Sequence, residues 1–219
     1  MSITKGLSTI KKTLPDGVTL VAVSKTKPIA DVQEAYDAGQ RIFGENKIQE
    51  MSEKKALLPK DIQWHMIGHV QTNKVRQMAE YISLVHGVDS LKLLEEIDKQ
   101  AAKHNRVINC LLQMHIAEEE TKFGLDKSEL MALLASEKLT TLDHICIKGL
   151  MGMATFTEDK IQIEKEFKHL KSIFDTAKSF ATSNCEMTIL SMGMSGDYEL
   201  AIACGSNMVR IGSSIFGTR

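Results

Sequence analysis

The sequence predicts an α/β protein that folds as a single (β/α)₈ barrel, also called a TIM barrel. Eight short apolar runs alternate along the chain with segments of helical periodicity. Nearly all of these runs are apolar throughout, as expected for parallel strands that helices cover on their outer face. The count of eight favours a closed barrel over the alternative, a flavodoxin-like or Rossmann sheet, and no GxGxxG motif follows the first strand.

The length and composition fit one globular domain, which we expect to span residues 1–219. Of the 219 residues, 43% are hydrophobic and 25% are charged, so the chain can bury a sizeable core. The formal net charge of -1 and the absence of a basic block give no general attraction to nucleic acid. We also expect no export signal and no membrane span, and four scattered cysteines fit a cytoplasmic protein.

The first predicted strand begins at Leu20 and carries Lys25 at its carboxyl end. The run between them is β-rich and too short for a helix, and Pro28 ends it. A lysine at the end of a strand is usually just solvated. Whether Lys25 has a function must therefore be judged from the rest of the chain. A helix over 29–36 follows, and Gly39 fits the position just after its end. The next elements are strands over 41–44, 62–70 and 82–88, with helices starting near Asn46 and over 73–81.

The second half of the chain continues the alternation. Ser90 is predicted to cap a helix over 91–101, and Asp126 with Glu129 forms a capping-box pattern before a later helix. The remaining predicted elements are strands over 107–116, 145–153, 187–192 and 208–211, a long helix over 158–181 and a short one over 197–204.

Two histidines, His65 and His69, have a spacing that could serve a metal on a helix. They lie instead in a strand-like run with Gly68 between them, and no acidic ligand follows. The sequence therefore predicts no metal site here.

Two turns rich in small residues follow the seventh and eighth strands. Phosphate commonly binds beside these two loops of a (β/α)₈ barrel. After the seventh strand, glycines flank Met194 and Ser195 before a helix N-terminus, and Gly212 and Ser213 follow the eighth. The turns predict a phosphate site, with ordinary tight connections as the alternative.

Arg210 lies two residues before Gly212 and therefore shares its face of the strand. It either pairs with a barrel carboxylate or addresses a ring nitrogen or an anion. Lys25 becomes a neighbour of the eighth strand when the barrel closes, and a nearby cation and partial burial would lower the pKa of its amine. A neutral amine forms a Schiff base with an aldehyde. An aldehyde that carries a phosphate and a ring nitrogen describes pyridoxal 5′-phosphate (PLP).

Seven sequence blocks follow one another over nearly the whole chain: VAVSKTKP, FGEN, WHMIGHVQTNK, KFG, GLMGMA, LSMGMSGD and VRIGSSIFG. Together they resemble the pyridoxal phosphate homeostasis protein family, whose members are similar to the barrel domain of alanine racemase. The resemblance implies a PLP fold-type III barrel with PLP held as a Schiff base on Lys25, and no such role for Lys27. It also implies that the phosphate contacts Met194, Ser195, Gly212 and Ser213. The pyridine nitrogen is then expected near Arg210, and the ring near Asn46.

The chain departs from the family pattern at two places. Lys47 stands where many relatives have a tyrosine after FGEN, which puts a ring contact from this position in doubt. Ser213 and Ser214 replace a common threonine–alanine pair, and a hydroxyl is retained.

The expected function is PLP binding for intracellular homeostasis, by buffering the cofactor or delivering it to apo PLP-dependent enzymes. The chain ends a few residues after its eighth strand, so we expect no counterpart of the C-terminal β domain that gives alanine racemase its tyrosine acid/base. An arginine beside the pyridine nitrogen also weakens the electron sink. Robust catalysis is therefore not expected.

Two alternatives stay open. One is a PLP-dependent enzyme of low or unidentified activity, such as an amino-acid racemase. The other is a phosphosugar-type barrel enzyme without PLP. We expect a monomer or a weak dimer, since no heptads or interface stripe stand out.

Overall fold

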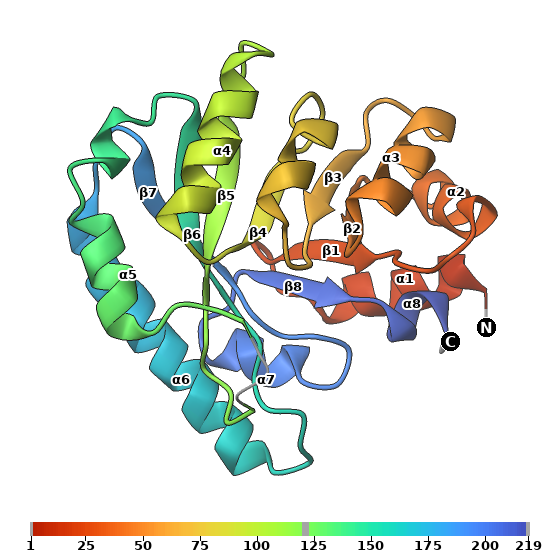
Figure 1. The fold of residues 1–219 in the computed structure, drawn as a ribbon. Coiled ribbons are helices and arrows are strands. Elements are labelled where there is room, and N and C mark those ends of the chain that lie inside the picture. Colours follow the sequence, from red (N-terminus) through yellow and green to blue (C-terminus); the bar gives the residue numbers. More distant parts are fainter. Residues whose placement is uncertain (1, 120–122, 218–219) are drawn as a thin grey trace.

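Eight parallel strands close into a barrel in the computed structural model, which describes residues 2–119 and 123–217. Each strand pairs with the next along the chain, and β8 returns to pair with β1 (Figure 1). The predicted (β/α)₈ barrel is therefore confirmed. The strands are β1 (Thr19–Val23), β2 (Ile42–Glu45), β3 (Gln63–Met66), β4 (Leu84–Val88), β5 (Ile108–Met114), β6 (Ile145–Gly152), β7 (Cys185–Ser191) and β8 (Met208–Ile211).

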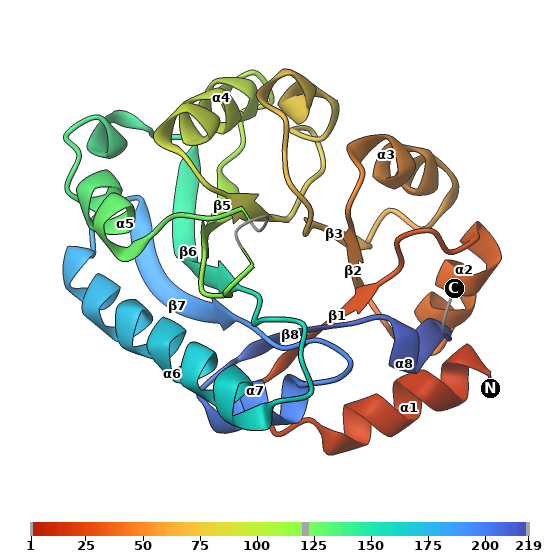
Figure 2. The ribbon, with the colours of Figure 1, turned by 60° about the horizontal axis from the view of Figure 1, so that its bottom comes forward.

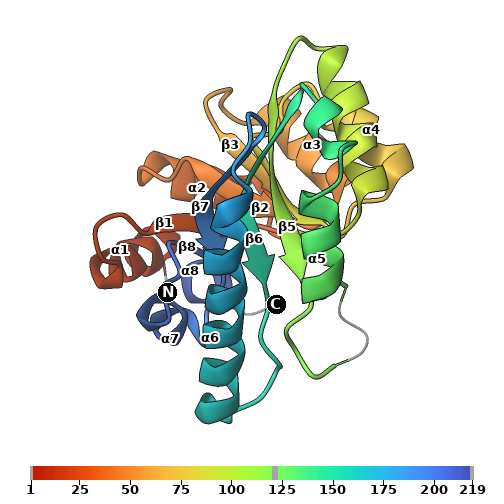
Figure 3. The ribbon, with the colours of Figure 1, turned by 90° about the vertical axis from the view of Figure 1, so that its left-hand side faces the viewer.

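Helices surround the strands on the outside of the barrel (Figure 2). Side views show α5 and α6 along the outer side of β5, β6 and β7 (Figure 3). In the part of the chain that the structure describes, no helix is both long and apolar enough to cross a membrane. The helices are α1 (Ile3–Thr13), α2 (Ile29–Asp37), α3 (Ile48–Leu57), α4 (Leu91–Ala102), α5 (Lys127–Leu134), α6 (Lys160–Ala177), α7 (Tyr198–Ala203) and α8 (Ser213–Phe216), with 3₁₀ turns η1 (Thr72–Gln77), η2 (Leu139–Thr141) and η3 (Lys178–Phe180).

The predicted helix caps form as expected. The Ser90 side chain accepts a hydrogen bond from the backbone of Leu93, which begins α4. Asp126 and Glu129 form the reciprocal capping box of α5. Gly39 follows the end of α2 with a φ of 87°, a left-handed conformation that suits glycine. Local hydrogen-bonding signals therefore located these helix ends correctly.

Several boundaries differ from the sequence prediction. The strand predicted over 62–70 ends at Met66, although Ile67 and Val70 remain partly or fully buried. Ile67 packs against the barrel interior and Val70 against the outer core, so both are apolar for reasons of packing and not of strand pairing. The helix predicted over 73–81 is the shorter 3₁₀ turn η1. Of the KFG block, Lys122 lies outside the described residues.

The core has an inner and an outer layer. The outer layer lies between strands and helices, and the large side chains of Phe43, Trp64 and Phe167 belong to it. The inner layer fills the barrel with five buried residues: Val21, Leu84, Leu111, Met151 and Met208. Polar side chains also enter the barrel, and two buried histidines are among them.

Candidate functional site

A cavity of about 400 Å³ opens at the carboxyl ends of the strands. Residues at or after the ends of seven strands line it: Val23, Lys25, Asn46, Ile67, Gly68, His69, Gln113, Phe123, Met153, Met194, Arg210 and Gly212. Five of the seven residues predicted from the sequence are in this lining. The other two, Ser195 and Ser213, lie in the adjoining turns. In (β/α)₈ barrels this face carries the functional groups.

Lys25 is the second residue after the end of β1 and is half-buried. It occupies the second position of a four-residue turn, in which the Lys27 amide donates to the Ser24 carbonyl at 3.0 Å. Val23 and Lys25 both line the cavity, two residues apart on the same face of the chain. The turn therefore presents the lysine side chain to the cavity from the rim of the barrel.

Arg210 lies on β8 beside Val21 of β1 and is 4% exposed. Its Nη1 donates to the Ser191 carbonyl at 2.9 Å and to the Ser191 hydroxyl at 2.7 Å, and its Nη2 donates to the Gly152 carbonyl at 3.0 Å. Burial lowers the pKa of Arg210 to about 10, while Asp197 acts in the opposite direction by electrostatic attraction. The guanidinium stays charged at neutral pH, and carbonyl and hydroxyl oxygens hold it in place.

A chain of polar side chains continues from Arg210 into the barrel. The Ser191 hydroxyl lies 3.3 Å from His86 Nδ1, and His86 Nε2 lies 3.0 Å from His65 Nδ1. Burial lowers the pKa of His65 to about 3 and holds the pKa of His86 well below its ordinary value, with His65 and Arg210 adding to the effect on His86. Both histidines are therefore neutral at neutral pH. Sequence analysis missed His86 and Ser191, because a single polar residue within an apolar strand gives no local signal of its partners.

The loops after β7 and β8 contact one another. The Gly212 amide donates to the Ser195 hydroxyl at 3.3 Å, and the Arg210 amide donates to the Gly193 carbonyl at 3.0 Å. Gly193 has a φ of 99°, a conformation that favours glycine. The Met194 amide donates to the Asp197 carboxylate at 2.5 Å, so this amide already has an acceptor.

Ser213 is the first residue of α8 and is exposed beside this pair of loops. The two turns predicted to bind phosphate thus lie together at one side of the cavity. Ser195 and Gly212 are in direct contact, and Ser213 follows Gly212 in the chain.

A second wall of the cavity contains His69 and Phe123, which sequence analysis did not assign to the site. Their rings stack with centroids 4.5 Å apart, and His69 Nδ1 lies 3.5 Å from the Asp89 carboxylate. His69 is at the rim, whereas His65 lies inside the barrel against His86. Within residues 2–119 and 123–217, no group of three or more metal-ligating side chains was found.

The arrangement suits an anionic ligand that carries a carbonyl group. A primary amine and a fixed guanidinium face one cavity, and two turns with backbone amides and hydroxyls lie beside it. Ile67, Met153 and Met194 supply apolar surface for a flat ring. The amine can add to a carbonyl, and the guanidinium can donate a hydrogen bond to a ring nitrogen or to an anion.

Comparison with known proteins gives a consistent result. The family model of the alanine racemase N-terminal domain matches residues 2–219. The pyridoxal phosphate homeostasis protein of Pasteurella multocida (strain Pm70) is 39% identical over 205 residues, which cover 92% of this chain and 87% of that protein. PipY of Synechococcus elongatus, solved without and with PLP bound, superimposes with TM-scores of 0.92 and 0.90. In both forms it is 36% identical, over 98% of this chain and 100% of that one.

Alanine racemase itself is a more distant structural neighbour. The enzyme from E. faecalis superimposes with a TM-score of 0.72 at 14% identity, over 100% of this chain and 58% of that one. At this identity the likeness concerns the barrel fold alone.

Proposed function

This chain belongs to the pyridoxal phosphate homeostasis protein family, and from that premise we propose that it binds PLP in the cavity at the mouth of the barrel. The family resemblance predicted from the seven sequence blocks is thereby confirmed. The observation that carries the proposal is the placement of Lys25 and Arg210 in one cavity, beside the paired turns of Ser195 and Gly212. These are the groups that an aldehyde, a ring nitrogen and a phosphate require.

The proposal gives each residue a separate role. The Lys25 amine adds to the aldehyde carbon and water leaves, which joins lysine and ligand by a Schiff base. Arg210 faces the pyridine nitrogen, and Asn46 lies beside the ring. The phosphate binds to the turns through Met194, Ser195, Gly212 and Ser213. The two serine hydroxyls are donors, and the Met194 and Gly212 amides exchange their present acceptors, Asp197 and Ser195, for phosphate oxygens. Lys47 is the exposed residue before α3 and has no role in this scheme.

The function that this site supports best is holding PLP for buffering or delivery, with no robust turnover. Bound PLP supplies an aldehyde that captures amines and a ring that withdraws electrons. A charged Arg210 beside the ring nitrogen disfavours a protonated ring, and this weakens the electron sink that carbanion chemistry needs. In this proposal one domain over 1–219 acts in the cytoplasm as a monomer or weak dimer, and apo PLP-dependent enzymes receive the ligand.

His69 favours a second candidate, a PLP-dependent enzyme of low activity such as a racemase. Its imidazole lines the cavity, and Asp89 lies within 3.5 Å of Nδ1, an arrangement typical of an acid/base residue. Addition of amino acids to the PLP-loaded protein separates the two candidates. Turnover of an amino acid, even slow, that is lost in His69→Gln would establish the enzyme, whereas unchanged amino acids support the carrier.

Absorption spectra before and after borohydride treatment, with peptide mapping of the reduced protein, test the main proposal. We expect a yellow protein whose visible band is bleached and a pyridoxyl group on Lys25. A protein that stays colourless with added PLP would overturn the proposal and favour a phosphosugar-type barrel enzyme.

Ser195→Ala and Ser213→Ala are each expected to weaken PLP retention by about 1–3 kcal/mol, the usual scale of charge-assisted hydrogen bonds. Ser195 should have the larger effect, because its hydroxyl also accepts from the Gly212 amide and orders the turn. Equilibrium dialysis of PLP against each variant measures the change. Ser128→Ala, an exposed serine on α5, is the control and should bind like the parent protein. Equal retention in all three variants would contradict the phosphate assignment.

A further inference from the structure

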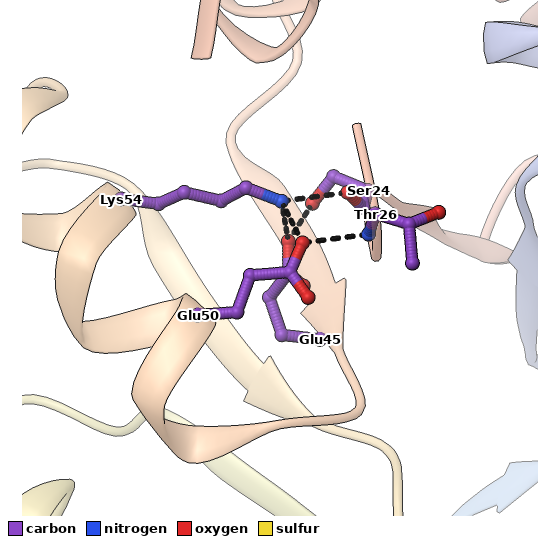
Figure 4. A network of polar contacts seen from close by, with 5 residues as sticks. All are labelled: Ser24, Thr26, Glu45, Glu50 and Lys54. Atoms are coloured by element: carbon purple, nitrogen blue, oxygen red, sulfur yellow. Dashed lines mark hydrogen bonds and ion pairs between the residues drawn. The ribbon is translucent and has the colours of Figure 1, made fainter. Parts of the chain in front are cut away.

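A buried cluster of three charged side chains lies against the turn that contains Lys25 (Figure 4). Lys54 on α3 lies 2.8 Å from Oε1 of Glu45, at the end of β2, and 2.7 Å from Oε1 of Glu50 on α3. The Lys54 and Glu45 side chains are only 5% and 0% exposed, and that of Glu50 is 22% exposed. We call these three residues the Lys54 cluster. Nothing in the proposed binding of PLP uses it directly.

The Lys54 cluster holds the backbone on both sides of Lys25. On one side, Lys54 Nζ donates to the Ser24 carbonyl at 2.8 Å, and the Ser24 hydroxyl donates to Glu45 Oε1 at 2.6 Å. On the other side, the Thr26 amide donates to Glu50 Oε1 at 2.6 Å. Figure 4 shows both contacts converging on the same group of side chains. The residues that flank the lysine are therefore fixed by charged groups from α3 and β2.

The turn needs such support because its conformation is unfavourable for its sequence. Thr26 has a φ of 63°, while Lys25 is not among the described residues with positive φ. Together with the bond from the Lys27 amide to the Ser24 carbonyl, this defines a type II turn with Thr26 in its third position. Type II turns favour glycine or asparagine there, and a β-branched residue is strained in the left-handed region. An outside contact to the Thr26 amide offsets that strain.

Burial of the Lys54 cluster is itself unfavourable, which indicates that it serves more than stability. Taking a carboxylate and an ammonium out of water costs more than an apolar pair of the same volume. Burial raises the pKa of Glu45, although the hydrogen bonds from Lys54 and Ser24 oppose this. Within the described residues, Glu45 Oε2 is buried without a hydrogen-bond partner, a rare condition that calls for an explanation.

We propose that Glu45, Glu50 and Lys54 are positioning residues that hold the turn of Lys25 and so direct its amine into the cavity. The inference rests on the proposed function, in which Lys25 joins PLP. Glu50 acts on Thr26, and Lys54 with Glu45 acts on Ser24. Loss of one contact lets the turn relax towards conformations that threonine prefers, and the lysine amine then spends less time in the cavity.

Glu50→Ala is the most informative variant, because Glu50 is partly exposed and its removal leaves the buried Lys54–Glu45 pair intact. Lys54→Met would strand a buried carboxylate and threatens folding. In the PLP-free protein, we expect hydrogen–deuterium exchange at the Thr26 amide to be about tenfold faster in Glu50→Ala. The equilibrium constant for borohydride-trappable attachment of PLP to Lys25 should fall by about the same factor. Exchange and attachment unchanged from the parent protein would overturn the proposal.

Glu53→Ala is the matched control, since it removes the same charge from an exposed position on the same helix. It should leave Thr26 exchange and PLP attachment unchanged. Losses in Glu53→Ala equal to those in Glu50→Ala would point to a general effect of charge on α3 and overturn the positioning role.

A second background tests the strain directly. Thr26→Gly places in the turn a residue that accepts positive φ without cost. In this background, Glu50→Ala should reduce PLP attachment much less than it does beside threonine. The same loss in both backgrounds would overturn the role in holding the turn.

Exchange at Thr26 is measured without PLP, so the two proposals can fail separately. If the parent protein forms no adduct on Lys25, the proposed function fails. Faster hydrogen–deuterium exchange at the Thr26 amide in Glu50→Ala would still support the proposal that Glu50 stabilises the turn of Lys25.

Discussion

Lys25→Ala is expected to abolish the borohydride-reducible attachment of PLP and to leave the barrel folded. The amine is the nucleophile of the proposed Schiff base, and alanine has no group that could replace it. Lys25 is half-buried at the cavity, after the end of β1 and outside both core layers, so its loss should cost little stability. Mass spectrometry of the reduced protein measures the adduct, and circular dichroism with thermal unfolding reports on the fold.

Lys27→Ala is the matched control for this experiment. Lys27 belongs to the same turn, but its Nζ donates to the Phe216 and Gly217 carbonyls, each at 3.0 Å. We expect this variant to keep the adduct, with a small loss of stability at the end of α8. An undiminished adduct in Lys25→Ala, or an adduct that is lost only in Lys27→Ala, would show that Lys25 is not the attachment site.

Acidification is expected to destabilise the fold by several kcal/mol through His65 and His86. An unfolded histidine has a pKa of about 6.5. In the folded protein burial lowers the pKa of His65 to about 3 and that of His86 well below its ordinary value. The unfolded state therefore binds more protons as the pH falls below about 6.5, and the free energy of unfolding decreases by up to about 1.4 kcal/mol per pH unit for each histidine. Together, the two histidines lower the free energy of unfolding by about 4 kcal/mol between neutral pH and pH 5.

Denaturant unfolding between pH 7.5 and 5 measures this slope, and two variants isolate its source. His86→Gln keeps a polar side chain beside Ser191 and should reduce the slope by about 1.4 kcal/mol per pH unit. His104→Gln changes an exposed histidine and should keep the parent slope. Comparing variants also removes the contribution of Glu45, whose raised pKa acts in the opposite sense. A parent-like slope in His86→Gln would contradict the assignment.

The site was only partly predictable from the sequence. Lys25, Arg210, Ser195 and Gly212 were found because each belongs to a local motif at the end of a strand, and the barrel brings strand ends together. Their PLP-binding roles remain predictions. His86, His69 and the contacts of the Lys54 cluster with Ser24 and Thr26 were missed, because these partners are distant in sequence. His86, for example, meets Ser191 only through the closure of the barrel.

By itself, the sequence determined the number and order of the strands, the N-caps of α4 and α5, and the family. Apolar periodicity and helix capping depend on residues close together in the sequence, so the sequence alone predicts the elements that they define. Only the tertiary structure decided that the third strand ends at Met66, that two neutral histidines lead to Arg210, and that charges from α3 hold Thr26. These features depend on strand register and on close approach of residues far apart in the chain. A local sequence pattern does not show which distant residues come into contact, because the packing of the whole barrel sets the distances between them.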